Sequence, residues 1–145
     1  MIAVDTNILV YAHREESVDN QRAYAALGEL ATARSRWAIP WPCVAEFLTV
    51  VTNHRIFDEP TPVVDALGQI DIWLESPSVV LLAEGPGAWP TMRSLVAESK
   101  ATGPRVYDAR IAAVCLTHAV RELWTAGRDY AWFPRLRTHN PLVGP

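Results

Sequence analysis

The chain opens with a short apolar run that ends at an acidic residue, and this start limits the folds that the chain can adopt. Residues Ile2 to Val4 are too few for a helix and do not alternate with polar residues, which is typical of a strand buried on both faces of a parallel sheet. Asp5 would then lie at the carboxyl end of the strand, the edge where open α/β sheets bind ligands. Thr6 and Asn7 favour the start of a helix, so the alternative role for Asp5 is to cap that helix.

Strands and helices are predicted to alternate along the rest of the chain. Further strands are expected at residues 37–39, 79–82, 122–124 and 136–139. Further helices are expected at residues 18–32, 42–53, 63–74, about 89–96 and 107–120. This order predicts an α/β fold with a mainly parallel sheet. Neither repeats nor linkers interrupt it, so we expect a single domain over residues 1–145.

Helical spacing also predicts which side chains face the core. Residues 18–32 would turn Tyr24, Leu27 and Leu30 inward, and residues 63–74 would turn Val63, Leu67 and Ile70 inward. Two cysteines, Cys43 and Cys115, stand among apolar residues and are expected to be buried and reduced.

The composition is that of a globular protein with no membrane-spanning segment. No apolar stretch is long enough to cross a bilayer, and the N-terminus lacks the basic start of a signal peptide, so we expect a cytoplasmic protein. The net charge of −3 argues against a protein that coats nucleic acid electrostatically. Residues 101–145, however, carry six arginines against three acids, which could supply phosphate contacts.

Four carboxylates lie at positions that suggest a shared site. Asp5 ends the first strand, Glu46 lies within an otherwise apolar helix, Asp108 opens the last predicted helix, and Asp129 follows the strand at residues 122–124. Because the carboxyl ends of parallel strands share one edge of a sheet, Asp5 and Asp129 are expected to converge.

An ionised Glu46 on an apolar helix would be costly to bury without compensation. A basic side chain could provide it, but a divalent cation would also hold several acids together. Oxygen ligands suit Mg²⁺ or Mn²⁺, which can activate a water molecule and stabilise charge on a phosphoryl oxygen. Hydrolysis of a phosphodiester is the chemistry that fits such a site.

Four segments in this order resemble the motifs of PIN-domain ribonucleases, most closely the VapC toxins of type II toxin–antitoxin systems. The segments are Val4 to Leu9, Val44 to Leu48, Tyr107 to Ala112 and Leu123 to Tyr130. The resemblance covers essentially the whole chain. It implies a PIN-like three-layer fold in which helices flank a central, mainly parallel five-stranded sheet.

The same resemblance implies an Mg²⁺-dependent endoribonuclease, with Mn²⁺ as a substitute, that cleaves RNA with a metal-activated water. It implies a homodimer and a cognate VapB-type antitoxin, with no membrane partner. The implied catalytic residues are Asp5, Glu46, Asp108 and Asp129, with Asp5 and Asp108 as the metal ligands. The implied polar residues that line the cofactor site are Thr6, Asn7 and Thr125.

One departure from the family pattern keeps alternatives open. The first aspartate that is common in the fourth motif is replaced by Gly127, which leaves Asp129 as the acid of that motif. The chain could therefore be a degenerate PIN domain that binds RNA or an antitoxin without cleaving. A haloacid-dehalogenase-like phosphatase is a further alternative, but its second aspartate would fall at Asn7, and Lys100 is the only lysine.

Overall fold

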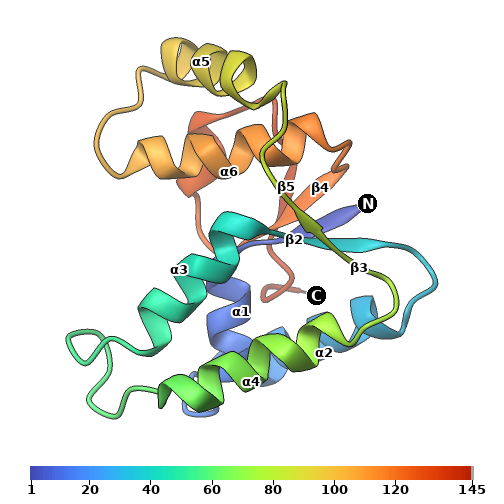
Figure 1. Ribbon diagram of the computed structural model, residues 1–145, viewed down its shortest axis with the longest axis vertical. Coiled ribbons are helices and arrows are strands. Elements are labelled where there is room, and N and C mark those ends of the chain that lie inside the picture. The colour runs from blue at the N-terminus through green and yellow to red at the C-terminus, as the bar shows by residue number, and fades with distance from the viewer. Residues whose placement is uncertain (145) are drawn as a thin grey trace.

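The computed structural model describes residues 1–144, and a five-stranded parallel sheet forms its centre (Figure 1). The strands are β1 (Ile2–Val4), β2 (Trp37–Pro40), β3 (Val79–Leu82), β4 (Glu122–Trp124) and β5 (Thr138–His139). Their order across the sheet is β3-β2-β1-β4-β5, and every neighbouring pair is parallel. The α/β class and the parallel five-stranded sheet are thus confirmed.

Helices cover the sheet on both sides. They are α1 (Thr6–His13), α2 (Asn20–Thr32), α3 (Trp41–Val51), α4 (Val63–Leu74), α5 (Ala88–Ser99) and α6 (Arg105–Thr117), together with the 3-10 helix η1 (Asp129–Trp132). Figure 1 shows α5 and α6 above the sheet and α1, α2 and α4 below it. This gives the layered arrangement that strands alternating with helices favour.

Strand β1 lies at the centre of the sheet, and its apolar side chains allow it to be buried on both faces and paired along both edges. Ala3 and Val4 are completely buried, and Ala3 pairs with Ala38 of β2 and Leu123 of β4. The chain places β2 and β3 on one side of β1 and then returns to place β4 on the other side. The strand order therefore reverses between β1 and β4, and this reversal is where α/β sheets form ligand sites.

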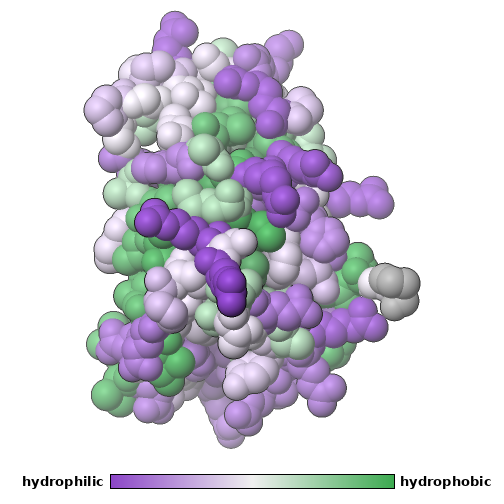
Figure 2. Space-filling model, turned by 90° about the vertical axis from the view of Figure 1, so that its right-hand side faces the viewer, coloured by the Kyte–Doolittle hydropathy of each residue, from purple (hydrophilic) through white to green (hydrophobic). Residues whose placement is uncertain are grey.

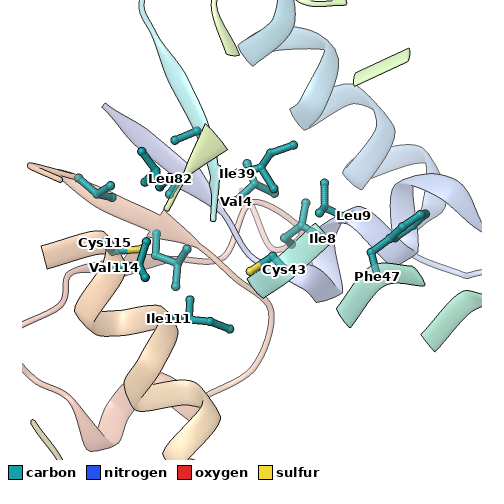
Figure 3. Close-up of a cluster of buried hydrophobic side chains, with 14 of the residues drawn as sticks. Val4, Ile8, Leu9, Ile39, Cys43, Phe47, Leu82, Ile111, Val114 and Cys115 are labelled. Atoms are coloured by element: carbon teal, nitrogen blue, oxygen red, sulfur yellow. The ribbon is translucent and has the colours of Figure 1, made fainter. Parts of the chain in front are cut away.

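One hydrophobic cluster joins the strands to all six α-helices. Figure 3 shows side chains from β1, α1, β2, α3, β3 and α6 meeting there. Cys43 of α3 and Cys115 of α6 belong to this cluster, and both are free and buried, as predicted. Both α3 and α6 pack against this core. The residues of these two helices that face away from the core are therefore also held in fixed positions.

The start of α2 differs from the prediction. The helix begins at Asn20 rather than at residue 18, and Val18 is exposed. The hydroxyl oxygen of Ser17 accepts a bond from the Asp19 amide, and the Asn20 side chain donates to the Tyr11 carbonyl. These local bonds keep a turn between α1 and α2 where the helix was expected to start.

Two predicted inward faces are also partly wrong. Tyr24 of α2 is 71% exposed, although Leu27 and Leu30 are buried as expected. In α4, Ile70 is buried as predicted, but Val63 and Leu67 are exposed, and Ala66 is buried in their place. Helix α4 lies at the edge of the molecule, so only a narrow strip of its apolar surface is covered.

The face that carries the amino ends of the strands is largely hydrophilic. Figure 2 shows polar and charged residues over the middle of this face, with hydrophobic residues along its lower left. No helix within residues 1–144 is both long enough and apolar enough to span a membrane.

Candidate functional site

Asp5 is a buried carboxylate held by donors from four different parts of the chain. Its side chain is at the end of β1, is 6% exposed, and caps α1 by accepting a 2.8 Å bond from the Thr6 amide. Thr125 Oγ1 donates at 2.7 Å, Tyr130 Oη donates at 3.2 Å, and Cys43 Sγ donates at 3.8 Å. Burial raises the pKa of Asp5 and these donors lower it, so the net pKa is above the ordinary value.

Asn7 fixes the loop that brings Thr125 to this carboxylate. Its amide nitrogen donates to the Ala126 carbonyl at 2.8 Å and to Thr125 Oγ1 at 3.2 Å, while the Ala126 amide donates to Asn7 Oδ1 at 3.1 Å. The first turn of α1 is thereby tied to the end of β4. Thr6, Asn7 and Thr125 therefore lie around Asp5, and their role in lining a cofactor site stays a prediction.

The three other predicted acids share one open cavity of about 550 Å³. Glu46 comes from α3, Asp108 from the first turn of α6, and Asp129 from the first residue of η1. Thr102, Pro104, Arg105 and Tyr107 complete the lining. The fold thus brings together all four acids, since the charge of Asp5 acts on both Glu46 and Asp108.

Electrostatic crowding shifts the titration of the acids that face this cavity. Partial burial, followed by the charges of Asp129, Asp5 and Glu46, raises the pKa of Asp108 to about 6, while Arg105 lowers it. Partial burial and the charge of Asp5 also raise the pKa of Glu46. The site therefore carries more negative charge than its own residues compensate.

The burial expected for Glu46 is not observed. We expected its carboxylate to be embedded in an apolar helix, but the side chain is only partly covered and opens onto the cavity. The buried side of α3 is formed by Cys43, Val44, Phe47 and Val51, and Glu46 lies beside that stripe. Asp5 is the acid whose burial needs compensation.

The chemistry of this site fits a divalent cation. Thr6 Oγ1 is buried and has no hydrogen-bond partner among residues 1–144, although it faces Glu46 closely enough to lower the pKa of that acid. This unpartnered hydroxyl and the carboxylates of Asp5 and Glu46 near it are all oxygen donors, which suit Mg²⁺ or Mn²⁺. Within residues 1–144, no three acidic, histidine or cysteine side chains are already close enough to hold a metal directly. Bound waters, which Mg²⁺ retains readily, would have to complete the coordination.

Gly127 has a backbone reason for being glycine. Its φ angle is +86°, in the left-handed region that an aspartate with its Cβ rarely adopts, and the space around the position is open. The loop after β4 therefore has the acid of Asp129 at the cavity but no carboxylate two residues earlier.

Three contributors were not identified from the sequence. Tyr130 was named only as the last residue of the fourth motif, Cys43 only as a buried thiol, and Arg105 was counted only among the six arginines of residues 101–145. Cys43 precedes Glu46 by three residues, and Arg105 precedes Asp108 by three, so helical spacing could have placed both beside the acids. The Tyr130 hydroxyl gave no such signal, because its partner Asp5 is 125 residues away.

Comparison with known proteins gives consistent relatives. A family model described as "PIN domain" matches residues 2–137. Ribonuclease VapC43 of Mycobacterium tuberculosis is 37% identical over 144 residues, covering 99% of this chain and 97% of the relative. Ribonuclease VapC25 of the same species is 28% identical over 143 residues, covering 99% and 100%.

Solved structures share the fold at low identity. The toxin–antitoxin complex VapBC2 from Rickettsia felis, bound to a promoter DNA fragment, contains a chain with a TM-score of 0.70 and 21% identity, covering 97% of this chain and 98% of that one. M. tuberculosis VapC20, a toxin that cleaves the sarcin–ricin loop, gives a TM-score of 0.64 at 15% identity, covering 90% and 93%.

The first prediction concerns the strongest donor to Asp5. Replacing Thr125 by valine keeps the side-chain volume but removes a hydrogen bond to a buried carboxylate. We expect the free energy of unfolding to fall by about 2 kcal/mol at neutral pH, measured by urea denaturation in EDTA. Thr49→Val is the matched control, since the Thr49 hydroxyl is exposed and bonds only within α3. Equal losses in the two variants would contradict the role of Thr125.

The second prediction concerns pH. Asp108 has a folded-state pKa of about 6 against an ordinary value of 3.8, so between these values the folded chain binds more protons than the unfolded chain. Its contribution to stability therefore falls as the pH rises through this window. In EDTA, the melting temperature of wild type minus that of Asp108→Asn should decrease from about pH 4 to about pH 7 and then level off. A difference in melting temperature that does not change with pH would contradict the raised pKa of Asp108.

Proposed function

Because this chain belongs to the PIN domain family and, within it, to the VapC group, we propose that it is a metal-dependent endoribonuclease and the toxin of a type II toxin–antitoxin pair. The observation that carries this proposal is the cavity shared by Glu46, Asp108 and Asp129, with the buried Asp5 within electrostatic reach. The PIN domain match also argues against the haloacid-dehalogenase-like alternative.

Asp5 and Asp108 would hold Mg²⁺, or Mn²⁺ in its place. Asp5 is suited to this role because four donors fix its orientation before any ligand arrives. Asp108 is suited because it projects from the first turn of α6 into the cavity while the core holds the rest of the helix. When bound, the metal supplies a water of lowered pKa and offsets charge on the phosphoryl oxygens.

Glu46 and Asp129 would orient the attacking water and accept its proton. Both carboxylates line the cavity, and the raised pKa of Glu46 makes it a better base than an ordinary glutamate. The water oxygen bonds to phosphorus as the phosphorus–oxygen bond to the leaving ribose breaks. The reaction is hydrolysis of an RNA phosphodiester.

Binding without cleavage is the second candidate function, and Gly127 is the observation that favours it. The left-handed backbone at this residue leaves the loop after β4 with Asp129 as its acid at the cavity. If catalysis needs a second carboxylate from this loop, the chain would retain RNA or antitoxin binding alone.

The proposed antitoxin would dock in an apolar cleft of about 330 Å³ between α2 and α4. Tyr24, Leu27, Ile72 and Trp73 line it, and the exposure of Tyr24 and Ile72 leaves apolar surface for a partner. The solved toxin–antitoxin complexes that share this fold support such a partner. We also propose that the protein acts in the cytoplasm, where RNA substrates are available.

The third prediction tests the ribonuclease. Wild-type protein purified free of antitoxin should cleave total bacterial RNA with Mg²⁺ or Mn²⁺, and EDTA should abolish cleavage. Asp5→Asn and Asp108→Asn should each lower the rate by about 100-fold or more, because even residues that only support metal ligands are worth about 10- to 100-fold. Asp71→Asn, which removes an exposed acid from α4, should leave the rate unchanged.

Two other results would redirect the proposal. RNA binding by wild type without cleavage in either metal would favour the non-cleaving candidate. Cleavage that survives both substitutions would overturn the site assignment.

The fourth prediction concerns the proposed homodimer. Sedimentation equilibrium of the isolated chain should give twice the 16.1 kDa mass of one copy. Exposed apolar side chains away from the α2–α4 cleft, such as Trp41 and Trp89, are available for a contact between copies. A single-copy mass across the whole concentration range would contradict the dimer.

A further inference from the structure

A cation–π contact joins the two short segments that carry Asp108 and Asp129. Arg105 begins α6, one turn before Asp108, and its guanidinium carbon lies 4.0 Å from the centre of the Trp132 ring. Trp132 is the last residue of η1, which begins with Asp129. The contact therefore bridges the two sides of the acidic cavity and fixes the position of the guanidinium group.

Arg105 is also placed where its charge is needed. Among the described residues that line the cavity, it is the single basic residue beside three acids. Within residues 1–144, no carboxylate forms an ion pair with it. Arg110, on the next part of α6, is instead paired with Glu84. The charge of Arg105 is thus available to a ligand, whereas that of Arg110 is already engaged.

An RNA strand that approached this cavity would meet several carboxylates of its own sign. A planar guanidinium can bind two phosphate oxygens at once and loses less conformational freedom when it is already stacked on an aromatic ring. We propose that Arg105 binds a backbone phosphate of the RNA beside the scissile bond and that Trp132 holds Arg105 in position. This inference rests on the proposed ribonuclease function and extends it to a substrate-binding residue.

The choice of phosphate as the ligand follows from the surroundings. Trp132 is 47% exposed and Arg105 lines the open cavity, so the pair lies where the open side of the cavity meets the solvent and not within the core. A strand that placed its scissile phosphate among the acids would carry its neighbouring phosphates past this open side. Arg105 would then contribute a sequence-independent contact that positions the strand.

The test measures RNA affinity without cleavage. In an Asp108→Asn background with Mg²⁺, binding of a fluorescent single-stranded RNA oligonucleotide of mixed sequence is followed by anisotropy over a range of salt concentrations. Arg105→Gln should weaken binding and reduce the slope of log affinity against log salt by about 0.7, the value for one phosphate contact to a single strand. Arg105→Lys should retain the slope because it retains the charge.

Two further variants separate this contact from general effects. Arg121→Gln removes the same charge from an exposed position before β4, at the opposite edge of the sheet, and should leave the slope unchanged. Trp132→Leu should weaken binding while keeping the slope, because the charge remains but is no longer held by the ring. Thermal melts establish that each variant is folded.

The outcomes test the role of Arg105 and the ribonuclease function separately. Suppose that the Asp108→Asn protein binds RNA and that adding Arg105→Gln changes neither the affinity nor the salt slope. The role of Arg105 is then overturned while the ribonuclease proposal stands. If Arg105→Gln and Arg121→Gln lower the slope equally, the effect is general electrostatics and the specific contact is also overturned. If the Asp108→Asn protein binds no RNA, the role of Arg105 is overturned, and cleavage by the wild type decides the ribonuclease proposal separately.

Discussion

The burial of one carboxylate, that of Asp5, is the constraint on which the rest of the site depends. A charge in this position is costly unless donors surround it, and no single segment of the chain can supply them all. The donors come from the start of α1, from α3, from the end of β4 and from η1. The hydrogen bonds to this carboxylate form only when these elements are correctly placed relative to one another. Asp5 is therefore both the centre of the site and a residue that links four segments of the fold.

The acids around the cavity differ from Asp5, because the protein does not supply enough donors or positive charge to compensate them. Three acids from different elements, Asp108, Glu46 and Asp129, line one cavity. The positively charged side chain of Arg105 lines it beside them. Such crowding lowers stability, and proteins tolerate it chiefly where function requires it. An added cation would relieve the repulsion, and an approaching polyanion would be favoured only where a positive group is fixed nearby. The stack of Arg105 on Trp132 provides such a group.

The loop after β4 shows how the motif retains its shape with one acid fewer. Gly127 adopts a left-handed backbone, Ala126 is bonded to Asn7, and Tyr130 reaches back to Asp5. Each of these interactions positions the loop without a carboxylate at residue 127. Asp129 is thereby held at the cavity by the packing and hydrogen bonds of its neighbours, and its exposed side chain remains free to meet water or substrate.

Local pattern by itself determined the order of strands and helices, the buried run before Asp5, and the acids that end strands or open helices, because these depend on residues adjacent in the chain. Only the tertiary structure decided that Asp5 and not Glu46 is buried, that Tyr130 and Cys43 orient it, and that Arg105 rests on Trp132. Those contacts join residues from 27 to 125 positions apart, and Thr125 reaches Asp5 across 120. No local periodicity encodes such pairs, since they arise only when the sheet brings the carboxyl ends of its strands to one edge.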